Sequence, residues 1–146
     1  MTEQLALLKI LLANTFVTYF KAHTYHWNVE GTNFSEMHEF FGEYYADVYG
    51  TADTFAEEMR ALDAYAPFSL TDLYSVKTIN EDPTKPGTTR EMLTNLQIAN
   101  DEMYNTLTKL FHAAEAEDNQ GLMNLVADRM DAHKKHGWMI RSFLKA

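Results

Sequence analysis

Two histidines and two carboxylates are spaced so that they could bind a divalent metal ion. His26 and His38 are twelve residues apart in the sequence. Asp53 and Glu57 are four apart, which places both carboxylates on one face of a helix. Imidazole nitrogens combined with carboxylate oxygens suit Fe²⁺ or Zn²⁺. The candidate metal ligands are therefore His26, His38, Asp53 and Glu57.

The usual ligand pattern of a di-iron site inside a helical bundle is Glu-x-x-His on two helices. None of the six histidines follows this pattern, because no glutamate stands three residues before any of them. The residues at those positions are Phe20, His23, Ser35, Lys109, Met130 and His133. An ordinary di-iron site within one chain is therefore excluded.

Four long segments with apolar residues at helical spacing must position the candidate ligands. We predict helices from Thr2 to Asn28, from Ser35 to Leu62, from about Thr88 to Ala116, and from just after Asn119 to Leu144. All three prolines fall in the connection between the second and third helices. Ser69 followed by Asp72 predicts a short helix in that connection, through Val76.

Two short-looped helical hairpins joined by one long crossover are the connectivity of ferritin-like bundles. The chain of 146 residues is also the right length for one domain. We therefore predict an all-α, ferritin-like four-helix bundle, with a short helix in the crossover, as a single domain over residues 1–146.

Two further patterns concern the ends and the packing of these helices. Asn33 with Glu36, and Thr88 with Glu91, have the spacing of capping boxes at helix N-termini. Small residues at 42, 46 and 50 form a stripe along the second helix. Since glycine weakens a helix by about 1 kcal/mol, we interpret this stripe as a place where helices approach closely at an interface.

The candidate ligands cannot all reach one ion within one chain. The first hairpin turn brings His26 near His38, but Asp53 lies fifteen residues beyond His38. On a straight helix that separation is about 22 Å. A two-fold dimer that pairs second helices antiparallel would place the two histidines of one chain beside the two carboxylates of the other.

The composition favours cations over nucleic acids as partners. The chain has 12 basic and 21 acidic residues, a net charge of -9, and no cysteine. It has no basic tail or patch, so we do not expect DNA binding.

Residues 1–4 show no secretory signal, which makes the cytoplasm the default location. The apolar run at residues 5–12 is broken by Lys9 and is too short to span a bilayer.

Two motifs and the ligand spacing resemble those of Dps-type miniferritins. The segment Lys21–Gly31, KAHTYHWNVEG, is similar to that family's first-helix signature, and Trp138–Ser142 resembles its last-helix motif. Counted from His26, the other candidate ligands follow at 12, 27 and 31 residues, as in the family. The family often has an acidic residue sixteen positions after the first histidine, whereas this chain has Gly42 there.

The resemblance implies an activity and an assembly. It implies a dodecameric shell built from two-fold dimers, with ferroxidase sites between subunits. Each site would oxidise Fe²⁺, by preference with hydrogen peroxide rather than oxygen, and ferric mineral would be stored inside, which protects against oxidative damage. Because of Gly42, a second iron would be held more weakly, or through water.

Several residues near these positions allow more than one interpretation. Trp27 could quench a radical left by one-electron iron oxidation, or it could be an interface aromatic residue. His23 is better explained by packing, or by a contact to a ligand, than as a ligand itself. His133 and His136 could chelate a metal but are better explained by packing at the surface or at an interface. The functional alternatives are a cage protein that binds metal without turnover and one that associates with DNA.

Overall fold

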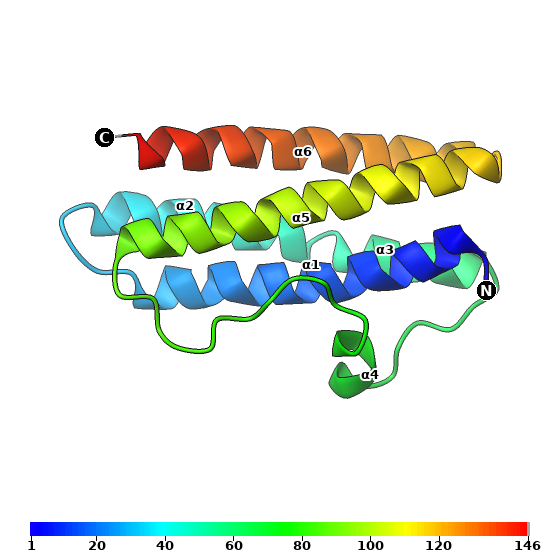
Figure 1. The fold of residues 1–146 in the computed structure, drawn as a ribbon, viewed down its shortest axis with the longest axis horizontal. Coiled ribbons are helices and arrows are strands. Elements are labelled where there is room, and N and C mark those ends of the chain that lie inside the picture. The colour runs from blue at the N-terminus through cyan, green and yellow to red at the C-terminus, as the bar shows by residue number, and fades with distance from the viewer. Residues whose placement is uncertain (146) are drawn as a thin grey trace.

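The computed structural model describes residues 1–145, and they form helices without any strand (Figure 1). The elements are α1 (Glu3–Asn28), α2 (Phe34–Tyr49), α3 (Ala52–Ala61), α4 (Leu70–Tyr74), α5 (Thr89–Ala116) and α6 (Gln120–Leu144). α1 forms a hairpin with α2, α5 forms one with α6, and the crossover carries α4 beside α1. The predicted all-α, ferritin-like architecture is confirmed.

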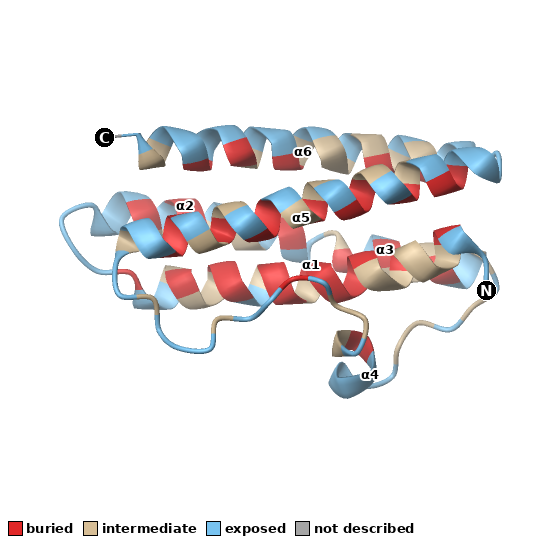
Figure 2. Ribbon diagram, viewed as in Figure 1, coloured by how far each residue is buried: buried red, intermediate tan, exposed pale blue. Residues whose placement is uncertain are grey.

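α1 is the most extensively buried helix in chain order before the crossover, with twelve buried residues distributed along its length (Figure 2). It packs against α2, α3, α4 and α5. By length and composition alone α1 could span a membrane, contrary to the expectation from the short run at its start. However, 56% of its most apolar 18-residue window is buried inside the bundle, as in the core helix of a folded domain.

The predicted helix from Ser35 to Leu62 is wrong in one respect, because the structure divides it into α2 and α3. The hydroxyl of Thr51 donates to the carbonyl of Val48 at 2.7 Å, and the Thr51 amide bonds to the same carbonyl at 3.2 Å. These bonds tighten the turn and replace the regular helical ladder. Gly50, a poor helix former, precedes Thr51 at the break.

The predicted caps differ in outcome. Ser69 and Thr88 cap their helices, with side-chain oxygens accepting from the amides of Asp72 and Glu91 at 3.0 Å. The Glu91 carboxylate bonds to the amide of Gly87 instead of completing the box. Asn33 makes no side-chain cap, so that prediction is wrong. Its backbone, at φ -103° and ψ 29°, lacks the extended conformation in which a cap side chain reaches the helix.

The crossover is fastened to the bundle by two polar anchors. α4 ends at Tyr74 rather than continuing through Val76. Beyond it, the buried Asn14 side chain accepts from the amides of residues 78 and 79 and donates to the hydroxyls of residues 78 and 106. Asp82 accepts hydrogen bonds from Lys21 and Tyr25 of α1. The long connection is therefore held in place.

Candidate metal site

His26 near the end of α1 and His38 near the start of α2 are brought together, as the sequence predicts. Their rings stack with centroids 3.7 Å apart and planes at 17°. Nδ1 of His26 donates to the carbonyl of His38 at 2.7 Å, and Nδ1 of His38 donates to the carbonyl of His26 at 2.6 Å. A carbonyl can only accept, so both Nδ1 atoms carry the proton. This leaves Nε2 of each ring able to coordinate a metal.

Gly42 of α2 provides room for this arrangement. A Cβ atom at this position would lie 3.0 Å from Nδ1 and 3.1 Å from Cε1 of His26. The glycine therefore admits the imidazole ring of the same chain. Gly50, in the same stripe, lies at the break between α2 and α3. Close helix approach at an interface, which the stripe predicts, stays a prediction.

Asp53 and Glu57 are exposed on α3, away from the two histidines. The hydrogen bond to Asp53, followed by repulsion from its charge, raises the pKa of Glu57. A cation between the two carboxylates would relieve that repulsion. Within residues 1–145, no group of three or more histidine, aspartate or glutamate side chains could hold a metal ion. One chain thus presents two separate ligand pairs.

Aromatic side chains surround the histidine pair. His23 stacks on Tyr45 with centroids 3.9 Å apart, and its ring lies 4.1 Å from that of Trp27. Nδ1 of His23 is hydrogen-bonded to the hydroxyl of Tyr19 at 2.9 Å. These contacts agree with the packing interpretation of His23. Neither Tyr19 nor Tyr45 was singled out from the sequence, because aromatic residues at helical spacing do not reveal which side chains they contact.

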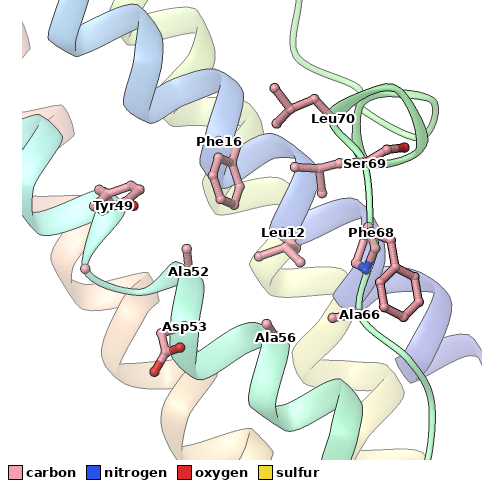
Figure 3. A pocket seen from close by; sticks show the side chains of 13 residues that line it. Leu12, Phe16, Tyr49, Ala52, Asp53, Ala56, Ala66, Phe68, Ser69 and Leu70 are labelled. Atoms are coloured by element: carbon pink, nitrogen blue, oxygen red, sulfur yellow. The ribbon is translucent and has the colours of Figure 1, made fainter.

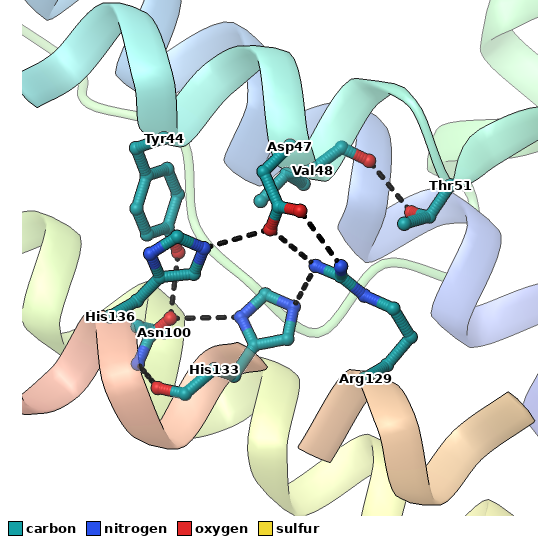
Figure 4. A network of polar contacts seen from close by, with 8 residues as sticks. All are labelled: Tyr44, Asp47, Val48, Thr51, Asn100, Arg129, His133 and His136. Atoms are coloured by element: carbon teal, nitrogen blue, oxygen red, sulfur yellow. Dashed lines mark hydrogen bonds and ion pairs between the residues drawn. The ribbon is translucent and has the colours of Figure 1, made fainter. Parts of the chain in front are cut away.

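His133 and His136 belong to a polar network rather than to a metal site (Figure 4). The buried His133 ring donates to Asn100 Oδ1 at 2.9 Å and accepts from Arg129 at 3.2 Å, so both ring nitrogens are occupied. His136 donates to the carboxylate of Asp47 at 2.8 Å, and Arg129 binds the same carboxylate through two nitrogens. Neither ring is left free for a metal, but the surface or interface position expected for the pair is wrong for His133, which is buried inside the chain.

Burial and hydrogen bonding together set the pKa values of the ionisable groups in this network. Burial lowers the pKa of His133 to about 3, and the nearby Arg129 charge acts in the same direction. Burial alone would raise the pKa of Asp47, but hydrogen bonds from His136 and Arg129 hold it well below its usual range. Asp47 and Arg129 are 82 residues apart, and nothing in the sequence pattern paired them.

A groove of about 550 Å³ lies between α1, α3 and the crossover (Figure 3). Its lining is mostly apolar and includes Phe16, Ala56 and Leu70, with Asp53 at one edge. Phe68, which also lines the groove, is 89% exposed. The groove offers no set of metal donors, and its surface is suited to contact with protein.

Comparison with known proteins places the chain in a family. The ferritin family, described as a ferritin-like domain, matches residues 5–146. The DNA protection during starvation protein of Brevibacillus brevis is 32% identical over 145 residues, covering 95% of this chain and 93% of that protein. The chain belongs to the Dps-type miniferritins. Antigen TpF1 of Treponema pallidum is 30% identical over 136 residues, covering 92% of this chain and 76% of that protein.

Solved structures agree with this miniferritin assignment. The crystal structure of TpF1 superposes with a TM-score of 0.93 at 27% identity, covering 98% of this chain and 92% of that one. Dps from Vibrio cholerae, described as a member of the ferritin-like diiron-carboxylate superfamily, gives a TM-score of 0.91 at 28% identity. It covers 98% of this chain and 90% of its own.

Proposed function

We propose that this miniferritin is a subunit of a cytoplasmic ferroxidase and iron-storage cage. It would oxidise Fe²⁺, with hydrogen peroxide preferred over oxygen, and store the ferric product as mineral, which protects against oxidative damage. The observation that carries this proposal is the reciprocal hydrogen bonding of His26 and His38. It fixes both rings with Nε2 available to a metal.

The complete site is proposed to lie between two chains. The histidines of one subunit would meet Asp53 and Glu57 of the other across a two-fold axis, giving two equivalent sites per dimer. Two features support this assembly: the ligand pairs are separate within one chain, and the apolar groove borders Asp53. We propose that six such dimers assemble into a dodecamer.

The residues would contribute charge and geometry to the reaction. Two carboxylates offset the charge of iron as it rises from Fe²⁺ to Fe³⁺, and two neutral imidazoles complete a donor set with room for the oxidant. Two Fe²⁺ ions together supply the two electrons that reduce one peroxide to water. The net charge of -9 attracts Fe²⁺ to the protein. Trp27, 56% exposed beside the site, is proposed to quench stray radicals.

The deciding experiment is anaerobic addition of Fe²⁺ followed by peroxide, with ferric absorbance recorded over time. The proposal expects rapid oxidation that Glu57→Gln slows strongly. Glu58→Gln is the matched control, because Glu58 is adjacent but turned away from the proposed ligand pair by one helix position. Tight Zn²⁺ or Fe²⁺ binding without peroxide-dependent oxidation would instead support the metal-binding alternative.

DNA association is the other alternative, because several relatives are named for DNA protection during starvation. We propose that this chain does not bind DNA at moderate salt, since its net charge is -9. A gel shift at low and at moderate salt tests this directly. A shifted band that persists at moderate salt would contradict the proposal.

A further inference from the structure

The break between α2 and α3 lies between the two halves of the proposed ligand set. His38 is on α2, whereas Asp53 and Glu57 are on α3, shortly after the break at Thr51. The buried residues keep the spacing of one helix across the break, at positions 48, 52, 55 and 59. The apolar pattern is therefore that of a continuous helix, and it does not account for the break.

Local contacts around Thr51 make the break. The hydroxyl and the amide of Thr51 both donate to the carbonyl of Val48, at 2.7 Å and 3.2 Å, which closes a tight turn. Gly50 admits this turn, because a Cβ atom there would lie 3.2 Å from the carbonyl oxygen of Ala46. The regular ladder resumes where the amide of Phe55 donates to the carbonyl of Thr51 at 3.1 Å. The Thr51 hydroxyl is thus a side-chain group that competes with the helical ladder.

The end of α2 is fixed to α6 just before the break. Asp47, one turn before Thr51, accepts two hydrogen bonds from Arg129 and one from His136 (Figure 4). Beyond the break, the ten residues of α3 pack along α1. This apolar packing sets which face of α3 is buried. The direction in which α3 leaves the fixed end of α2 is set by the backbone at Gly50 and Thr51.

A small change in this direction is enough to misplace the carboxylates. Glu57 lies about 9 Å beyond Thr51 along the helix, so a rotation of about 10° at the break moves it by about 1.6 Å. Metal sites hold their ligand distances to within about 0.2 Å. Asp53 and Glu57 are exposed and hydrogen-bonded to each other, so they move with the helix that carries them.

We propose that Thr51 is a positioning residue for the carboxylate half of the iron site; the inference rests on the proposed shared site. Its hydroxyl holds the break, and the break directs Asp53 and Glu57 toward the histidines of the other chain. Tyr49 and Ala52, on either side of the break, line the apolar groove together with Asp53 (Figure 3). The break therefore borders the surface on which the second chain would dock. Thr51 itself does not bind iron.

Two substitutions separate the hydroxyl of Thr51 from its shape. Thr51→Val keeps a branched side chain of similar shape but removes the hydroxyl, whereas Thr51→Ser keeps the hydroxyl. Each is tested in a shell built from heterodimers of full-length chains that hold one complete site. The histidine chain carries Asp53→Asn and Glu57→Gln, and the carboxylate chain carries His26→Ala and His38→Ala. Calorimetric titration with Zn²⁺ measures the affinity of the complete site, and gel filtration checks assembly.

The expected result depends on which chain carries Thr51→Val. In the carboxylate chain it should lower the Zn²⁺ affinity about 10- to 100-fold, the range seen when groups that orient metal ligands are changed. Thr51→Ser in the same chain should keep the affinity. In the histidine chain, Thr51→Val should leave the affinity unchanged, because α3 of that chain carries no ligand. A general loss of stability would act equally from either chain.

Three results overturn the role of Thr51 alone. They are an equal loss of affinity from either chain, no loss from the carboxylate chain, and Thr51→Ser binding as weakly as Thr51→Val. If the heterodimer with unchanged Thr51 binds Zn²⁺ no more tightly than the two parent homodimers, the shared site of the proposed function fails, and the role of Thr51 fails with it.

Discussion

Replacing Gly42 by alanine should raise helix stability and weaken metal binding at the same time. Alanine is favoured over glycine within a helix by about 1 kcal/mol. The added Cβ, however, would lie 3.0 Å from Nδ1 of His26, whereas ordinary contact begins near 3.4 Å. The ring must therefore move by about 0.4 Å, which disturbs the 2.7 Å hydrogen bond to the carbonyl of His38.

The expected loss of metal affinity is about 10- to 100-fold, the usual cost of disturbing a group that orients a metal-binding histidine. Calorimetric titration with Zn²⁺ measures the affinity, and thermal unfolding measures the stability of the same sample. Gly121→Ala is the matched control, because a Cβ there meets no atom within 4 Å. It should leave affinity unchanged. Unaltered Zn²⁺ affinity in Gly42→Ala would refute the geometric account of the histidine pair.

Three other outcomes are expected. Replacing His26 and His38 together by alanine should abolish rapid peroxide-dependent Fe²⁺ oxidation, measured by absorbance, in a shell that gel filtration shows to assemble. An unchanged initial rate of oxidation would contradict the assignment of these histidines as ligands. The pKa of His133 is about 3 in the folded chain and near 6.5 in the unfolded chain. Between pH 6.5 and pH 3 the unfolded state therefore binds more protons than the folded state. The free energy of unfolding should fall by up to about 1.4 kcal/mol for each pH unit as the pH drops through this range. Denaturant titrations at several pH values check this, and His133→Gln should flatten the dependence. Asn14→Leu should cost about 3 kcal/mol in urea unfolding, because it leaves the buried amide of Ile79 and the part-buried amide of Thr78 without their acceptor. A loss below about 1 kcal/mol would show that the anchor is dispensable.

Periodicity and loop length were sufficient to predict the long helices, apart from the break between α2 and α3, and the contact between His26 and His38. Both features follow from local spacing, since a short turn forces the end of α1 against the start of α2. The absence of a complete ligand set within one chain was also predictable, because the distance along a helix is fixed by its rise per residue.

Other features depend on contacts that spacing does not encode. The break at Gly50 and Thr51 depends on the hydrogen bond from the Thr51 hydroxyl to the Val48 carbonyl, which competes with the backbone hydrogen bonds of a continuous helix. The residue types alone do not show which of the two is more stable. The pairing of Asp47 with Arg129 joins distant segments, so no local pattern reveals it. The tautomers of the histidine pair depend on the approach of backbone carbonyls, which only the folded hairpin provides.

The central claim is that each iron site is shared by two chains, and complementation tests it most directly. One parent lacks His26 and His38, and the other lacks Asp53 and Glu57. Each parent homodimer then contains only half-sites and should oxidise Fe²⁺ no faster than background. In the purified heterodimer, one site regains all four ligands and the other has none, so about half of the unmodified activity per dimer should return. Correctly assembled heterodimers that remain as inactive as both parents would contradict the shared site.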